Sequence, residues 1–227
     1  MPGKNLRELA GHPLIAYSIA AAQTAGVFDA VVVSTDSEEI ATVATSYGAE
    51  VPGLRPAEMA GSTSPDIEWV RHTIESLAAE GREFEVFSLL RPTSPFRGPE
   101  TICSAFEALV ELGDQADSIR AVQLCREHPG KMWVVEGNLM RPLLDQPDGV
   151  PYHSRQYQSL PTVHVQNSSI EVAWTRALRE HDSIAGERVA PFFADDAAGF
   201  SIDYPDDWRR AEEMAASEDV SLPAVAR

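Results

Sequence analysis

Two kinds of apolar periodicity alternate along this chain of 227 residues, and the alternation limits the folds that it can adopt. Residues 13–26 and 99–112 repeat apolar side chains with helical spacing, whereas residues 30–33 and 86–90 are short continuous apolar runs. Such runs are typical of parallel strands that are covered on both faces by helices. We therefore predict an α/β fold with parallel strands.

The alternation continues beyond these segments. Further helices are expected at 37–48, 65–81 and 206–216, and further strands at 118–124, 164–175 and 189–194. Between Pro129 and Pro161 the periodicity disappears among several prolines, glycines and short apolar strings. We predict one domain over residues 1–227, from which residues 129–161 depart as a small arm of short strands and loops.

Composition excludes several classes of function. Lys+Arg 18 against Asp+Glu 35 gives a net charge of -17, which repels nucleic acid and anionic membranes. No stretch is long or apolar enough to span a bilayer, and the N-terminal residues lack the apolar core of a secretory signal, so we expect a cytoplasmic protein. Cys103 and Cys125 have no ligand spacing and are expected to be small buried side chains.

The two lysines of the chain both lie on connections between elements. Lys4 sits in the turn PGKN before an apolar helix, and Lys131 follows a His-Pro-Gly turn. Ligand-binding groups concentrate on such connections, so both are candidates for anion binding. The alternative is that a bias toward arginine left two arbitrary surface lysines.

Eight short strings occur in an order and spacing that point to a known family: PGKN, VVVSTD, GAEVPGLRPAE, LLRPTSPFR, EHPGK, QSLP, QNSS and SID. Together they resemble the acylneuraminate cytidylyltransferases, or CMP-sialic acid synthetases, over nearly the whole chain. The resemblance implies a Rossmann-like, three-layer nucleotidyltransferase fold with a mostly parallel mixed sheet and a small dimerisation arm. It also implies transfer of CMP from CTP to an acidic keto-sugar, with Mg²⁺ as cofactor, pyrophosphate as product and a homodimer as the assembly.

The resemblance assigns nucleotide and metal roles to four residues. Lys4 and Asn5 belong to the nucleotide-binding segment, with Lys4 near the triphosphate, and Arg55 matches an arginine near the nucleotide. Asp203 matches the first aspartate of the family's SIDID motif, which holds magnesium, while Pro205 replaces the second. The alternatives are a surface ion pair for Arg55 and a helix N-cap for Asp203, although we assign the capping to Asp206.

The acceptor side departs from the family pattern. Lys131 matches a lysine near the carboxylate of the acid sugar, and Asn167 an asparagine at the sugar site, unless it is a buried amide of a strand. Arg91 replaces a glutamine that touches the sugar, so that it could clamp a second anion. These changes leave the acceptor open among a sialic acid-like nonulosonic acid, KDO and a phosphonate.

Other readings remain open. The family's glycine-rich, phosphate-binding loop and the strand before it have no counterpart here, so we expect the chain as written to be weakly active or inactive.

A non-catalytic paralogue that binds a nucleotide or sugar is one alternative function. A GT-A-like glycosyltransferase is another, but its Asp-x-Asp motif has no well-placed counterpart among Asp36, Asp195 and Asp196.

Overall fold

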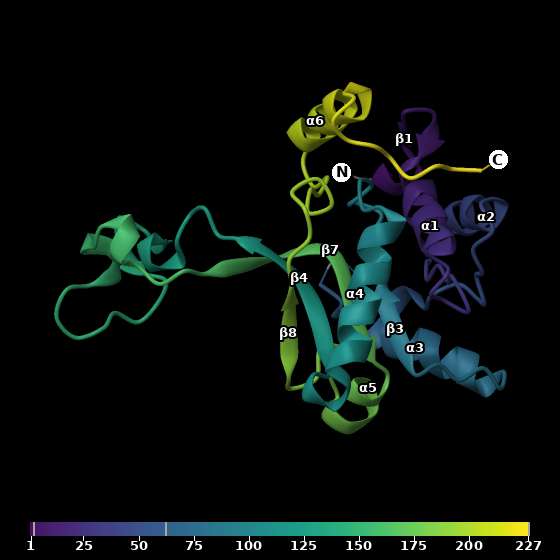
Figure 1. Cartoon of the computed structure of the whole chain (residues 1–227), viewed down its shortest axis with the longest axis horizontal. Coiled ribbons are helices and arrows are strands. Elements are labelled where there is room, and N and C mark those ends of the chain that lie inside the picture. Colours follow the sequence, from purple (N-terminus) through teal and green to yellow (C-terminus); the bar gives the residue numbers. More distant parts are fainter. Residues whose placement is uncertain (2, 62, 227) are drawn as a thin grey trace. The chain divides into compact units, whose positions relative to one another are not determined.

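The chain forms two compact units in the computed structural model, which describes residues 1, 3–61 and 63–226. The first unit comprises Met1–Ala121 and Asn167–Arg227, and the second comprises Val122–Gln166 (Figure 1). The range expected for the arm, 129–161, lies inside the second unit. Over the residues described, no helix has the length and apolar character that a membrane crossing requires.

The helices begin and end close to where the sequence predicts. Pro13 directly precedes the first of them, and Gly26, with φ 66°, ends it in the left-handed conformation that glycine favours. Ser37 caps the second helix, because its hydroxyl accepts a hydrogen bond from the backbone N–H of Ile40 at 3.3 Å. The α-helices are α1 (Leu14–Ala25), α2 (Glu38–Ser46), α3 (Asp66–Ala79), α4 (Pro99–Leu112), α5 (Arg176–His181) and α6 (Pro205–Ala216).

A four-stranded mixed sheet forms the centre of the first unit. Its order is β3 (Val86–Leu89), β7 (His164–Trp174), β4 (Ser118–Leu124) and β8 (Val189–Phe192). β3 pairs antiparallel with β7, and β4 pairs parallel with β8. Helices and a mixed sheet in one unit confirm the predicted α/β class.

The apolar run at residues 30–33 does not form the expected strand. Only Val32 makes a bridge, which is parallel and joins it to Glu50. The N–H of Glu50 donates to the carbonyl of Val31, and the N–H of Val33 donates to the carbonyl of Glu50. The next donor on that side would come from residue 52, which is proline and has no N–H. The ladder therefore stops after one residue.

Short elements complete the first unit. β1 (Glu8–Leu9) and β2 (His12–Pro13) pair as a small antiparallel hairpin before α1. Single 3-10 turns occur at Lys4–Leu6, Ala57–Met59 and Gly113–Gln115. The main core lies between α1, α4 and the sheet, where Ile102, Leu109 and Ile119 are almost fully buried.

The second unit is built around one hairpin. β5 (Trp133–Glu136) and β6 (Leu139–Pro142) pair antiparallel, and three 3-10 turns accompany them at Pro129–Lys131, Tyr152–Ser154 and Tyr157–Ser159. The imidazole of His128 stabilises the turn at Pro129–Lys131, since its Nδ1 accepts a hydrogen bond from the N–H of Gly130 at 2.9 Å. Apolar side chains of the hairpin face solvent: Val135 is 72% exposed and Leu139 is 79% exposed.

Candidate active site

Lys4 and Asp203 form an ion pair between opposite ends of the chain. Gly3, with φ 70°, turns the backbone into the 3-10 turn that carries Lys4. The lysine Nζ lies 3.1 Å from Oδ1 of Asp203 and donates to the carbonyl of Ile202 at 2.9 Å. The structure thus brings together the residue predicted to lie near the triphosphate and the residue predicted to hold magnesium.

The surroundings of Asp203 favour its charged form. Its Oδ2 accepts a hydrogen bond from Ser201 at 2.9 Å, and Ser201 in turn contacts the hydroxyl of Thr93 at 3.3 Å. Burial alone raises the pKa of Asp203, but the hydrogen bonds from Ser201 and Lys4 and the lysine charge outweigh burial, so this pKa lies below its usual value. Asp203 is therefore an anion at neutral pH.

The capping role expected of Asp206 is taken by its neighbour. Oδ2 of Asp207 accepts from the backbone N–H groups of Asp203 and Tyr204, at 3.0 and 2.7 Å. Asp206 instead pairs with Arg209 on the surface of α6. Because α6 begins at Pro205, one residue earlier than predicted, the third helical position falls on Asp207, where a carboxylate can reach back to these donors. The carboxylate of Asp203 is left out of the capping.

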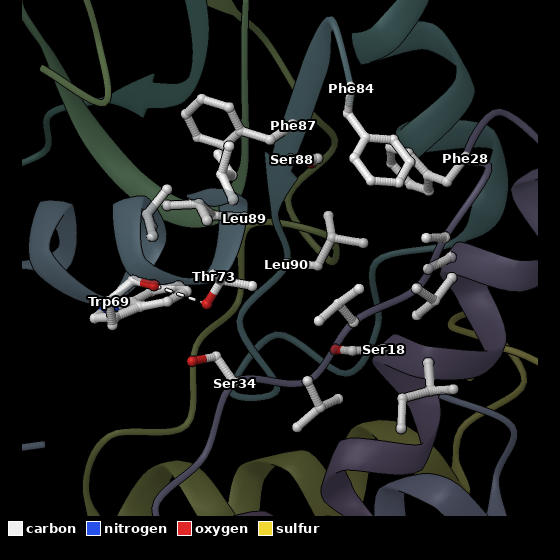
Figure 2. Close-up of a pocket in the computed structure, with 18 of the residues that line it drawn as sticks. Ser18, Phe28, Ser34, Trp69, Thr73, Phe84, Phe87, Ser88, Leu89 and Leu90 are labelled. Atoms are coloured by element: carbon white, nitrogen blue, oxygen red, sulfur yellow. Dashed lines mark hydrogen bonds between the residues drawn. The ribbon is translucent and has the colours of Figure 1, made fainter. Parts of the chain in front are cut away.

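A cavity of about 710 Å³ lies between residues 27–36 and β3 (Figure 2). Its body is apolar, and the side chains that surround it come from α1, α3 and the two extended segments. Its lining also includes Asn5 of the turn Lys4–Leu6 and four charged side chains that follow strand-like segments or begin a helix: Asp36, Arg55, Asp66 and Arg91. The carboxyl ends of such segments are where open α/β sheets bind ligands.

Arg55 is fixed against the wall of this cavity. Its Nε donates to the hydroxyl of Ser34 at 3.2 Å and its Nη2 to the carbonyl of the same residue at 2.5 Å. The guanidinium lies 4.8 Å from the ring centroid of Trp69, which is a cation–π contact. Burial lowers the pKa of Arg55, while the charges of Asp36 and Asp66 act in the opposite direction. Arg55 remains a cation with its planar group held in place.

Arg91 is placed between two carboxylates. Its Nη2 lies 2.5 Å from Oδ2 of Asp66 and 3.2 Å from Oε1 of Glu171. The other oxygen of Glu171 forms an ion pair with Arg120. Two cations and two anions make this cluster neutral as a whole, so Arg91 offers less attraction to a further anion than an unpaired arginine would.

The two remaining acceptor-side candidates lie in different units. Asn167 is buried in β7, where its Oδ1 accepts from the N–H and the hydroxyl of Ser169, which agrees with the structural alternative considered for it. Lys131 belongs to the second unit. Its Nζ donates to the carbonyls of His153 and Arg155 at 3.2 and 2.7 Å. A role of either residue at an acceptor stays a prediction.

One carboxylate is available for the expected magnesium. In the described part of the chain, no group of three or more histidine, cysteine, aspartate or glutamate side chains could hold a metal ion. Magnesium in phosphate-transfer sites is commonly bound by one or two carboxylates, with waters and substrate phosphates as the other ligands. Asp203, which is 56% exposed on its side chain, fits such a site.

Several residues of the site were not predicted from the sequence. Asp66 and Trp69 lie one turn apart at the start of α3, and the indole Nε1 donates to Oδ1 of Asp66 at 2.9 Å. Their spacing of three positions was a readable signal for such a contact. Neither Glu171 nor Arg120 could be predicted as a site residue from the sequence, because each lies within a strand and has apolar residues on both sides.

The comparisons with known proteins show which family the chain belongs to. Residues 1–145 match the family model described as cytidylyltransferase. The CMP-N,N'-diacetyllegionaminic acid synthase of Legionella pneumophila is 36% identical over 223 residues, which cover 94% of this chain and 90% of that protein. The N-acylneuraminate cytidylyltransferase of Escherichia coli O18:K1:H7 is 40% identical over 102 residues, which cover 45% of this chain and 23% of that protein.

A solved structure supports the fold independently. The CMP-2-keto-3-deoxy-manno-octonic acid synthetase complexed with CTP superposes with a TM-score of 0.65 at 13% identity, and covers 95% of this chain and 92% of that one. At this identity the likeness concerns the fold alone. The sequence matches show that the chain belongs to the cytidylyltransferase family, and the structural likeness shows that it has the α/β nucleotidyltransferase fold.

Proposed function

We propose that the protein transfers CMP from CTP to a nonulosonic acid and releases pyrophosphate. The observation that carries the proposal is the contact between Lys4 and Asp203 in a member of the cytidylyltransferase family. A cation and an exposed carboxylate at one place are the groups that a magnesium triphosphate requires, because the transferred phosphate spreads charge over its oxygens.

The chain's own residues bind and orient the nucleotide. Lys4 donates to phosphate oxygens, and Asn5 and Arg55 line the cavity beside it, where Arg55 is held by Ser34 and Trp69. The acceptor hydroxyl attacks the α-phosphorus in line, and pyrophosphate leaves on the opposite side. Because positioning dominates this reaction, the fixed orientation of Arg55 matters as much as its charge.

Magnesium is the proposed cofactor, with Asp203 as its protein ligand. When bound, it neutralises phosphate charge and lowers the pKa of the attacking hydroxyl. Asp203 suits this role because its pKa is held below the usual range, so that no proton competes for its oxygens near neutral pH. Ser201 keeps Oδ2 of the carboxylate oriented.

The acceptor class follows from the named relatives. They are a legionaminic acid synthase and an acylneuraminate cytidylyltransferase, both named for nine-carbon acidic keto-sugars. We propose Arg91 and Asn167, both in the first unit, as acceptor-binding residues. A carboxylate of the acceptor that binds Nη2 of Arg91 would compete with Asp66, the more exposed of its two partners.

We further propose that two copies associate through the hairpin of the second unit. Val135 and Met140 pair across β5 and β6, so they share one face of the hairpin, and each is more than half exposed. Apolar side chains gathered on one small hairpin mark an interaction surface. A second copy is the proposed partner, because an identical hairpin can cover them symmetrically.

Pyrophosphate release tests the proposed reaction. Purified protein is incubated with CTP, Mg²⁺ and one of four acceptors: N,N'-diacetyllegionaminic, pseudaminic, N-acetylneuraminic or 2-keto-3-deoxyoctonic acid. Because the chain as written is expected to be weakly active at best, we expect slow release with at least one of the three nine-carbon acids, and none when CTP or the acceptor is omitted. CTP binding by calorimetry without release from any acid would instead favour the non-catalytic paralogue.

A further inference from the structure

The loop that follows β3, at residues 90–97, is largely buried although it has no regular structure. Ser94, Phe96 and Arg97 are each at most 4% exposed, and Pro95 is one of the fully buried side chains. Pro92 and Pro95 have no N–H with which to bond the loop to its surroundings. Loops usually lie on the surface, because buried backbone groups need partners. Side chains must therefore hold this loop in place.

Arg97, at the end of the loop, provides such a hold. Its Nη1 donates to the carbonyl of Ser169 in β7, and its Nη2 donates to the hydroxyl of Ser18 in α1 at 2.8 Å. Nη1 also lies 3.4 Å from the carbonyl of Arg91, near the start of the loop. One planar group thus joins β7, α1 and both ends of the loop.

The charge of Arg97 is not neutralised by the groups that it contacts. Its acceptors are carbonyl and hydroxyl oxygens, and no carboxylate of the described residues forms an ion pair with it. Burial lowers the pKa of Arg97 to about 9, so the side chain is still a cation at neutral pH. A buried cation without an anion is a poor source of stability, because its desolvation is not offset. What the guanidinium does provide is several donors in fixed directions.

The loop held by Arg97 carries the contacts that place Asp203. The carbonyl of Thr93 accepts from the N–H of Ile202 at 2.9 Å, and the hydroxyl of Thr93 accepts from Ser201 at 3.3 Å. Ser201 and Ile202 directly precede Asp203, and the hydroxyl of Ser201 also contacts Oδ2 of the carboxylate at 2.9 Å. A displaced loop would therefore displace this carboxylate.

The same loop is connected to the turn that carries Lys4. Phe96 packs in one buried cluster with Leu14, the first residue of α1. The N–H of Leu14 donates to the carbonyl of Arg7 at 3.0 Å, and the N–H of Arg7 donates to the carbonyl of Lys4 at 3.2 Å. Both members of the pair between Lys4 and Asp203 are thus referred to the loop after β3.

We propose that Arg97 is a positioning residue of this enzyme, which holds the loop after β3 against α1 and β7 and thereby sets the distance between Lys4 and Asp203. This inference rests on the proposed function, in which these two residues bind the magnesium triphosphate. Arg97 is 1% exposed and acts through the loop, without touching a substrate. Its effect on turnover comes from geometry, because small displacements of reacting groups strongly slow a reaction that depends on positioning.

Two substitutions separate the geometry of Arg97 from its charge. Arg97→Lys keeps the charge but has one nitrogen in place of the two Nη atoms that bond to Ser169 and Ser18. Arg97→Met removes the charge as well. Hydrogen exchange is measured without substrate at the amide of Ile202, which bonds to the loop, and at the amide of Leu109, which lies buried within α4 and reports on global opening.

Turnover is measured in the same variants, with CTP, Mg²⁺ and each of the three nine-carbon acids, well below the thermal midpoint. In Arg97→Lys we expect exchange to rise at least about tenfold more at Ile202 than at Leu109. We expect kcat to fall at least about tenfold, while the KM for CTP changes less than about threefold. Arg97→Met should show effects at least as large, and if it does not fold, the lysine variant alone decides.

Asp117→Asn is the control for a general loss of stability, because this buried carboxylate bonds to Arg188 and lies outside the site. It should lower the thermal midpoint without a selective effect on exchange at Ile202 or on kcat. Equal acceleration at Ile202 and Leu109 in Arg97→Lys would show that Arg97 serves stability alone and would overturn the proposal. Exchange and turnover like those of the parent would overturn it too, because the charge would then suffice.

The two measurements also distinguish this inference from the proposed function. If the parent chain releases no pyrophosphate with any of the acids, the proposed function fails. Exchange at Ile202 needs no substrate, so it still decides whether Arg97 positions the loop.

Discussion

The Nζ of Lys4 lies 3.1 Å from Oδ1 of Asp203, although 199 positions separate the two residues in the sequence. Thr93 helps to hold them together, because its carbonyl accepts from the N–H of Ile202 at 2.9 Å and its hydroxyl contacts Ser201. The loop after β3 therefore positions the carboxylate from one side while the turn at Gly3 presents the lysine from the other.

Replacing Asp203 tests its role as the proposed metal ligand. Asp203→Asn keeps the shape and the hydrogen bond from Ser201 but removes the charge, so we expect CTP turnover to fall at least about 100-fold with little change in the thermal midpoint. Asp206→Asn is the matched control, since that exposed carboxylate pairs with Arg209 and, within the described residues, not with Lys4. A loss of activity in both variants, or in neither, would remove Asp203 from its assigned place.

The cluster around Glu171 should contribute to stability. Glu171 is 5% exposed and pairs with both Arg91 and Arg120, so Glu171→Gln leaves two partly buried cations without their shared anion. We expect the free energy of unfolding in urea to fall by about 3–5 kcal/mol. Glu136→Gln, which breaks the exposed pair with Arg141, should cost at most about 1 kcal/mol. Equal losses would show that burial of the cluster has no energetic consequence.

The carboxylate of Asp117 stabilises the fold, and we expect this contribution to be lost at acid pH. Its oxygens accept from the Arg188 side chain at 2.8 Å and from the N–H groups of Arg188 and Glu187 at 2.9 and 3.0 Å. These hydrogen bonds hold the pKa of Asp117 well below its usual value, and the bond from the Arg188 side chain has the largest effect. A depressed carboxyl pKa stabilises the fold above the unfolded pKa of about 3.9, and this contribution is lost as pH falls toward the folded value.

The corresponding variant is Asp117→Asn. At pH 7 its thermal midpoint should lie below that of the parent, and the difference should shrink as the pH is lowered below about 4, where the parent loses its advantage. Asp114→Asn is the control, because that aspartate is 96% exposed on its side chain and forms a surface ion pair with Arg176. A constant difference between pH 3 and pH 7 would contradict the assignment.

The sequence predicted those elements whose ends carry a local signal. Pro13 and Gly26 delimit α1, and Pro99 opens α4, so both helices were found within a residue or so. The strand predicted at residues 30–33 was wrong for a local reason as well, because Pro52 of the neighbouring segment has no N–H to continue the hydrogen-bond ladder. Apolar composition alone does not make a strand when its neighbour lacks a donor.

Other features depend on contacts that no local pattern contains. Arg97 lies in a loop string that looks exposed, yet it is 1% exposed and donates to the carbonyl of Ser169 and to the hydroxyl of Ser18. Burial lowers its pKa to about 9. The partners of Arg91 and Arg120 come from distant segments in the same way, so the family pattern could place Arg91 at a site but could not show that two carboxylates already neutralise it.

The hairpin of the second unit provides the last test. If two copies associate through the face of β5 and β6 that carries Val135 and Met140, Met140→Glu places a charge in the contact and should weaken dimerisation at least about 100-fold, as expected for a central apolar contact. Leu54→Glu is the matched control, because Leu54 is also exposed, at 45%, but lies in the first unit. Sedimentation equilibrium over a range of concentrations measures both. A parent chain that is monomeric at all concentrations, or an equal effect of the two substitutions, would exclude the hairpin as the dimer contact.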